Sequence, residues 1–217
     1  RAATLTPPRV RVEEAVVLDA ETLAVRGRLR LFAEVGEAAF TSPENQIVYR
    51  TGLLEVRVQP VAAVAYQLAL FNLEEDSEFL LDESFLEDAD AEDFDRLGAS
   101  PPVAAPEGRF GLPWFGVAFA GRYLVRVYAV DQNWFDYARS TGGEGGVLGG
   151  LLGDAFERPI FNLEDGIGLF GSASVDSVGF VVLPRAAARA AAAAAPVGAV
   201  LRPAGAVGDP AGNRLSP

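Results

Sequence analysis

Residues 23–35 read LAVRGRLRLFAEV, the stretch with the clearest periodicity in the chain. Its odd-numbered positions from Leu23 to Val35 are apolar or small, whereas its even-numbered positions include three arginines and a glutamate. Successive side chains of a β-strand point to opposite faces, so a period of two predicts a strand with one buried and one solvated face. We therefore expect one long strand over Leu23–Val35, with its odd-numbered side chains in the core.

Similar patterns recur along the rest of the chain. Alternating or continuous apolar runs predict further strands over residues 9–19, 46–50, 53–59, 61–71, 109–121, 122–130 and 173–183. Pro113 predicts a bulge or an edge strand, and Asn133 is the expected N-cap of a short helix that ends near Ser140. Many strands with few helices are typical of an antiparallel β-sandwich. The predicted fold class is all-β, with one or two short helices.

Composition divides the chain into two parts. Residues 1–184 contain every predicted strand and form the expected β-sandwich domain, with an acidic insertion at 72–98. Residues 185–217 begin RAAARAAAAAA and form a low-complexity tail rich in Ala, Gly and Pro. Ala-rich helices of this length are marginal in water, so something else has to order the tail. Docking on another subunit and docking on its own sandwich are both open.

The amino acids that are absent exclude several kinds of chemistry. Half of the 217 residues are hydrophobic, enough for a sizeable core, but the chain has no Cys, His or Met, and all 18 of its basic residues are Arg. A thiol nucleophile, a histidine base and a lysine Schiff base are therefore impossible, and zinc, copper and haem sites lose their usual ligands. A glycosidase-like carboxylate pair and a cation site with oxygen ligands remain. We expect a protein that is not an enzyme.

The acidic residues are concentrated in one segment. Twelve carboxylates and no basic residue lie between Glu74 and Asp95, and outside this segment the acids and the arginines balance, so it carries the whole net charge of −12. Without a basic excess, a nucleic-acid partner is not expected. Residues 84–87, SFLE, fit a capping box and predict an acidic helix over 84–97 that Gly98 ends. We interpret the segment as a solvated acidic face.

Calcium is the one cofactor for which this segment offers candidates. Asp88, Asp90 and Glu92 alternate as EF-hand ligands do, but the sixth loop position is Asp93 instead of Gly and the twelfth is Ala99 instead of Glu. That loop is therefore excluded. An irregular calcium site stays open, with the candidate ligands Asp82, Glu83, Asp88 and Asp90.

Gly166, Gly168 and Gly171 have the spacing of a dinucleotide-binding loop. Such a loop needs a helix after its glycines, because the helix N-terminus faces the pyrophosphate. The residues after Gly171, SASVDSVGFVVL, instead predict a strand, and polyalanine lies where the ribose-binding acid is needed. We expect a tight glycine turn before the last strand, and no bound dinucleotide.

The region 120–183 carries a resemblance to a known family. Residues 120–140 read AGRYLVRVYAVDQNWFDYARS, and Asn162, Asp165-Gly166, Gly168 and Phe170-Gly171 follow. This pattern resembles the C-terminal part of a Bacteroidota family of uncharacterised outer-membrane lipoproteins, often encoded beside TonB-dependent receptors. The resemblance implies a fold class and a location outside the outer membrane, but no catalytic residues. The lipidated Cys of such proteins is absent, and we expect Arg1 to follow a processing event such as removal of a secretory signal.

These observations favour a secreted or cell-surface protein that works by contact with other proteins. It would be a subunit of an extracellular assembly or filament, or an accessory of an outer-membrane complex. The alternative is an outer-membrane-attached module that binds calcium or carbohydrate. Trp114 and Trp134 are interpreted as core anchors instead of sugar platforms, and the absence of an apolar run of membrane length predicts no transmembrane span.

Overall fold

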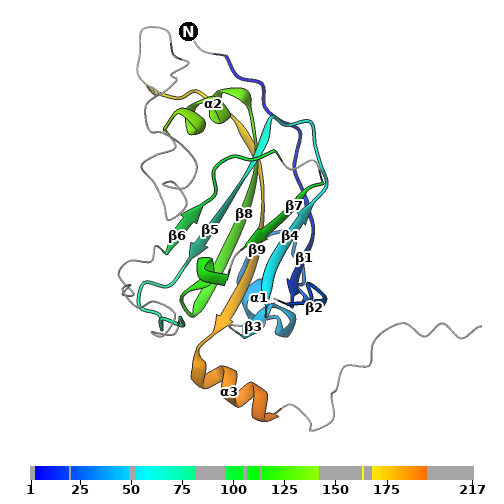
Figure 1. Ribbon diagram of the computed structural model, residues 1–217, viewed down its shortest axis with the longest axis vertical. Coiled ribbons are helices and arrows are strands. Elements are labelled where there is room, and N and C mark those ends of the chain that lie inside the picture. The colour runs from blue at the N-terminus through cyan, green and yellow to red at the C-terminus, as the bar shows by residue number, and fades with distance from the viewer. Residues whose placement is uncertain are drawn as a thin grey trace, which may run out of the picture.

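The computed structural model describes residues 3–19, 21–48, 52–81, 96–104, 107–112, 114–141, 163 and 168–194. Strands predominate in these ranges and form two sheets, so the chain is all-β. The helices are α1 (Glu37–Thr41), α2 (Gln132–Thr141) and α3 (Arg185–Ala194), with short 3-10 turns at Pro43–Asn45 and Trp114–Val117. Figure 1 shows α2 and α3 at opposite ends of the long strands. None of the helices in the described ranges has the length and apolar character needed to cross a membrane.

The first sheet has the order β2-β1-β4-β7, and all its pairings are antiparallel. Its strands are β1 (Val12–Leu18), β2 (Val25–Arg28), β4 (Leu53–Val58) and β7 (Arg109–Leu112). Strand β7 lies at an edge of the sheet, as expected. It ends at Leu112 and the 3-10 turn Trp114–Val117 follows, so the strand expected over 109–121 is wrong beyond Leu112.

The second sheet has the order β3-β9-β8-β5-β6. Its strands are β3 (Gln46–Val48), β5 (Ala65–Asn72), β6 (Leu97–Ala99), β8 (Gly121–Val130) and β9 (Ala173–Leu183). The sheet is mixed, not purely antiparallel as expected, because β3 runs parallel to β9 with Gln46 opposite Val181. Asn45, the residue before β3, donates a 2.8 Å hydrogen bond from its amide to the carbonyl of Gly179 and so holds the start of β3 beside β9.

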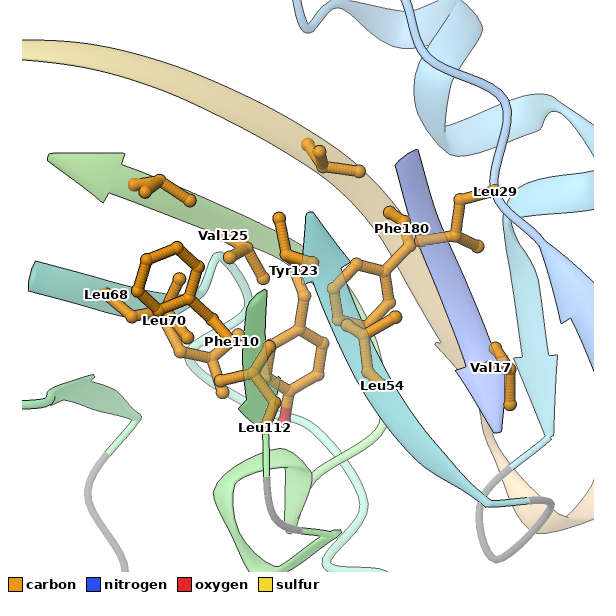
Figure 2. Close-up of a cluster of buried hydrophobic side chains, with 14 of the residues drawn as sticks. Val17, Leu29, Leu54, Leu68, Leu70, Phe110, Leu112, Tyr123, Val125 and Phe180 are labelled. Atoms are coloured by element: carbon orange, nitrogen blue, oxygen red, sulfur yellow. The ribbon is translucent and has the colours of Figure 1, made fainter. Parts of the chain in front are cut away.

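One cluster of buried side chains draws on both sheets (Figure 2). The first sheet contributes Val17, Leu54, Val56, Val58, Phe110 and Leu112, and the second contributes Leu68, Leu70, Tyr123, Val125, Val127, Val178, Phe180 and Val182. The rings of Tyr123 and Phe180 stack with centroids 5.4 Å apart. The Tyr123 hydroxyl donates to the carbonyl of Phe119 at 2.9 Å, and burial raises the pKa of this hydroxyl. The buried tyrosine therefore keeps a polar partner inside the core.

The expected long strand over residues 23–35 is wrong. Only Val25–Arg28 is a strand, and of the odd-numbered apolar residues Leu29 is 6% exposed while Leu23 is 60% exposed. The cause lies at Arg30, whose N–H donates to Asn45 Oδ1 at 2.8 Å and whose carbonyl accepts from Asn45 Nδ2 at 3.1 Å. A buried side-chain amide thus takes the place of a neighbouring strand, and the sheet ends there.

Two expectations about helix ends also need correction. Asp131, not Asn133, caps α2, because its Oδ1 accepts the N–H of Trp134 at 2.9 Å and its carbonyl accepts the N–H of Phe135 at 3.1 Å. Residues 84–95 of the expected acidic helix over 84–97 lie outside the described residues. Leu97 and the following glycine are described, belong to β6 and pair with β5. Strand pairing therefore excludes a helix that extends to Leu97.

Candidate functional site

The candidate calcium ligands Asp82, Glu83, Asp88 and Asp90 lie outside the described residues, so the calcium site stays a prediction. Within the ranges that the structure describes, no three acidic side chains come close enough to hold a metal ion. Of the acidic residues of the segment that are described, Glu74 and Glu78 contact arginines.

Two arginines hold the start of the acidic segment against the second sheet. Glu74 Oε1 lies 2.6 Å from Nε of Arg122 on β8. Arg96 donates to the carbonyl of Glu74 at 2.8 Å and to Ser77 Oγ at 2.6 Å, and its guanidinium lies 4.1 Å from the ring centre of Phe119. This part of the acidic segment therefore has a structural use.

Glu78 joins the same segment to α3. The backbone N–H of Arg185, the first residue of α3, donates to Glu78 Oε2 at 3.0 Å, and the Arg185 guanidinium donates to Oε1 at 2.9 Å. These bonds hold the pKa of the Glu78 carboxyl below its ordinary value. The same guanidinium also donates to the carbonyls of Phe79 and Leu81. Helix α3 has no buried residue, so this contact at its N-terminus anchors it.

Gly168 and Gly171 of the glycine motif lie in the described residues, whereas Gly166 does not, and the chain at Gly171 packs against α2. Gly168 has a φ of 140°, and β9 begins shortly after Gly171, as the sequence predicts. A Cβ at Gly171 would lie 3.2 Å from Asp131 Oδ1 and 3.4 Å from Trp134 Cβ. Gly171 thus permits close approach of its backbone to the N-terminus of α2. A dinucleotide loop requires a helix after its glycines, whereas the strand β9 follows here.

A surface of partly exposed side chains lies on the face of β5, β8 and β9 opposite the core. These side chains alternate with the buried residues Tyr123, Val125 and Val127. Register pairs place Tyr128 between Gln67 and Val175. We name as the arginine–aromatic face Gln67, Phe71, Leu124, Arg126, Tyr128, Val175 and, from α2, Trp134.

Contacts within the arginine–aromatic face hold its large side chains in place. The Arg126 guanidinium lies 5.0 Å from the ring centre of Phe71. The Tyr128 and Trp134 rings stack with centroids 6.0 Å apart, and Trp134 Nε1 donates to Gln67 Oε1 at 3.0 Å. Trp134 is therefore a half-buried residue of this outer face, which corrects its interpretation as a core anchor. The Trp114 side chain lies outside what the structure describes.

The arginine–aromatic face combines fixed aromatic rings with an available cation. In the part of the chain that the structure describes, no carboxylate forms an ion pair with Arg126, and Val175 is 48% exposed. Arginine and aromatic side chains on a flat, ordered surface are the residues that dominate protein–protein hot spots. The face is chemically suited to contact with another protein.

The sequence contains a partial indication of this face. In residues 122–130, RYLVRVYAV, the even-numbered positions that alternate with the core residues are Arg122, Leu124, Arg126 and Tyr128. A merely solvated strand face has small polar and charged residues, whereas this one has bulky amphipathic side chains. Trp134 had no such signal, because its contact depends on where α2 lies.

Comparison with known proteins returned no match of the chain to a family model, to a curated protein or to a solved structure.

Proposed function

We propose that the protein is a non-enzymatic, secreted or cell-surface β-sandwich protein that works by contact with other proteins. It acts as a subunit of an extracellular assembly or filament, or as an accessory of an outer-membrane complex. The observation that carries this proposal is the arginine–aromatic face, where Arg126 on β8 packs against Phe71 and Tyr128 on β8 stacks against Trp134 of α2. The core shared by the two sheets supports the sandwich, and the family resemblance of residues 120–183 supports the location.

The sheet makes the arginine–aromatic face suitable for specific recognition. Strand β8 pairs with β9 over its whole length and with β5 over eight register pairs, so the side chains of the face stand on a rigid support. A rigid surface loses little conformational entropy when a partner binds. Removal of one central Arg or aromatic residue from such an interface typically costs about 2 kcal/mol or more, which weakens binding roughly thirtyfold.

A photo-crosslinking amino acid at position 175 tests the proposal in cells that produce the protein. We expect it to form an adduct with a polypeptide, either a second copy or another protein, because Val175 is 48% exposed within the arginine–aromatic face. The matched position is Leu5, which is 85% exposed and lies outside the face. Adducts from position 5 as abundant as those from position 175 would contradict the proposal.

An Arg126→Ala change in the same cells sharpens the result. It removes the cation of the face without opening the core, so the adduct from position 175 should decrease by at least about tenfold. Arg139→Ala is the control, because Arg139 on α2 is an exposed arginine that likewise lies near an aromatic ring, 5.9 Å from the ring centre of Phe135, but outside the arginine–aromatic face. Equal losses in both variants would show that the face has no special part in recognition.

Binding of carbohydrate is the second candidate function. The stacked rings of Tyr128 and Trp134 beside the Gln67 amide favour it, since sugars bind to aromatic rings next to amide groups. Titration with bacterial polysaccharides should then show binding that Trp134→Ala abolishes, with no polypeptide adduct from position 175. If calcium stabilised the folded protein more than sodium chloride of equal ionic strength did, the protein would be a calcium-binding module.

A further inference from the structure

The outer edge of the first sheet exposes apolar side chains that the sequence pattern predicts to be buried. Leu23, Val25 and Leu31 are 60%, 43% and 37% exposed. Strand β2 is the terminal strand of its sheet, so in the described part of the chain no strand covers its far side. We name this region the β2 edge: Leu23, Val25, Arg26, Arg28 and Leu31.

Leu23 adds a feature that the stability of the fold does not explain. Its φ of 56° lies in the left-handed region, which is unfavourable for a non-glycine residue. Its N–H donates to the carbonyl of Asp19 at 2.9 Å, and the Asp19 carboxylate accepts the N–H of Thr22 at 2.8 Å. These bonds hold the turn that carries Leu23. The N–H and hydroxyl of Thr22, followed by the Arg26 guanidinium, keep the pKa of the Asp19 carboxyl far below its usual range. A bulky apolar side chain is thus held in solvent at an energetic cost.

The β2 edge also presents two exposed arginines. The side chains of Arg26 and Arg28 are 53% and 63% exposed, and each contacts one carboxylate, Asp19 or Glu14. Glu14 also contacts Arg57, which contacts Glu55 as well. A guanidinium has five N–H donors, and one carboxylate leaves several of them open to another acceptor.

The backbone of β2 can accept another strand. Leu29 N–H donates to the Ala15 carbonyl at 2.8 Å, and Val17 lies opposite Gly27. In an antiparallel ladder this places the backbone groups of Gly27 and Leu29 toward β1 and those of Arg28 on the far side. Arg26 is the extra residue of a β-bulge, because Val17 lies opposite Gly27 and Leu18 lies opposite Val25, so the ladder does not fix the direction of its backbone groups. The free backbone groups, the cations and the apolar side chains therefore lie on one edge.

We propose that the β2 edge binds an extended segment of a partner protein in which acidic and apolar side chains alternate, and that this segment pairs with β2 as an added strand. Backbone pairing supplies affinity in this mode of recognition, and the alternate side chains supply specificity. The acidic residues would meet Arg26 and Arg28, and the apolar residues would cover Val25. Pairing of β2 with β2 of a second copy is disfavoured, because arginines would face arginines. The proposal does not depend on the arginine–aromatic face.

Fluorescence anisotropy on the full chain tests this site with a labelled peptide of alternating Glu and Val. We expect saturable binding at low ionic strength. Arg28→Gln should weaken it by at least about fivefold, and Val25→Asp by at least about tenfold, because the latter places a like charge under the peptide. Arg109→Gln is the matched control, since Arg109 is an exposed arginine on β7, the opposite edge of the same sheet. The expected change for this control is less than about twofold.

Two further peptides separate strand pairing from simple charge attraction. A peptide of the same sequence with every backbone nitrogen methylated keeps its charges but has no N–H donor on either edge, so it cannot pair, and we expect it not to bind. A peptide with Lys in place of Glu should also fail to bind. Equal binding of the methylated peptide, no binding of the parent peptide, or an equal effect of Arg109→Gln and Arg28→Gln would overturn the proposal.

The last test asks whether the β2 edge binds a second copy of the chain instead of a partner protein. Sedimentation velocity without peptide should show the same oligomeric state for the wild-type chain and Arg28→Gln. Loss of a self-associated form in Arg28→Gln would assign the β2 edge to a second copy and overturn the proposal. Thermal unfolding of each variant shows whether it is folded, and Arg28→Gln alone decides the question if Val25→Asp does not fold.

Discussion

Strand β8 lies inside the second sheet, whereas β2 forms the edge of the first (Figure 1). On β8, Tyr123 and Val125 are 1% exposed, but Val25 on β2 is 43% exposed. Strand β8 has β5 on one side and β9 on the other, while β2 has three register pairs with β1 alone. Alternation in a sequence thus describes the two faces of a strand, and burial of one face depends on the neighbours that cover it.

The strongest test of this contrast replaces one apolar residue in each region. Phe180→Ala removes the ring that stacks on Tyr123 and leaves a cavity beside β8. We therefore expect the free energy of unfolding to decrease by about 3–5 kcal/mol. Val25→Ala should change it by less than about 0.5 kcal/mol. Urea unfolding of both variants measures the difference, and similar losses would show that β2 is as well packed as β8.

Much of the fold was predictable, because strand periodicity and proline positions are local signals. The strands over 122–130 and 173–183 follow from alternation and from β-branched residues. The length of β2 and the parallel direction of β3 were not predictable. Both rest on contacts between segments far apart in the chain, and Asn45 is an example, since its partners are 15 and 134 positions away.

The second prediction concerns the substitution of Asn45, which bonds both to Arg30 after β2 and to Gly179 on β9. Asn45→Ala leaves the N–H and carbonyl of Arg30 and the carbonyl of Gly179 without their partner, and Asn45 is fully buried. Unsatisfied buried polar groups cost about 1–3 kcal/mol, so a total loss of roughly 2–3 kcal/mol is expected in urea unfolding.

Asn133→Ala is the matched control for this change. Asn133 also bonds to two backbone carbonyls, those of Ala3 and Phe170, but these bonds are exposed to solvent. Water replaces the lost partner there, so the expected loss is less than about 1 kcal/mol. If the two variants lost the same stability, burial of the Asn45 bonds would make no difference, and this amide would not be important for how Arg30 is held.

The third prediction concerns the far end of the 23–35 stretch, where Val35 and α1 pack on β9. A Cβ at Gly179 would lie 2.6 Å from Val35 Cγ1 and 3.1 Å from Phe40 Cε1. Gly179→Ala should therefore push these side chains away and destabilise the protein by about 1–2 kcal/mol, with faster hydrogen exchange in α1. Gly111→Ala on β7 meets no atom within 4 Å and should cause neither effect.

The candidate surfaces were less predictable than the fold. The arginine–aromatic face could be read in part from Arg126 and Tyr128, which alternate with the core residues of β8. The β2 edge could not, since the pattern of Leu23 and Val25 is the pattern of a buried strand. The sequence contains the chemistry of that edge, but only the three-dimensional fold shows that its own chain leaves it uncovered.

The smallest expected effect has the opposite sign, and it tests whether the apolar residues of the β2 edge serve the fold at all. Leu23 has a φ of 56° and is 60% exposed, and Asn adopts this left-handed region more readily than Leu does. Leu23→Asn therefore relieves backbone strain and removes little buried surface, so the free energy of unfolding should increase by about 0.5–1 kcal/mol.

Leu29→Asn is the matched change, because Leu29 belongs to the same sequence pattern but is only 6% exposed. Burial of an amide in place of an apolar side chain should destabilise the protein by more than about 2 kcal/mol. Thermal and urea unfolding of the two variants decide the matter. A loss of stability in Leu23→Asn would mean that Leu23 supports its own fold, whereas a gain, together with weaker binding of the acidic peptide, would mean that this position is retained for a partner.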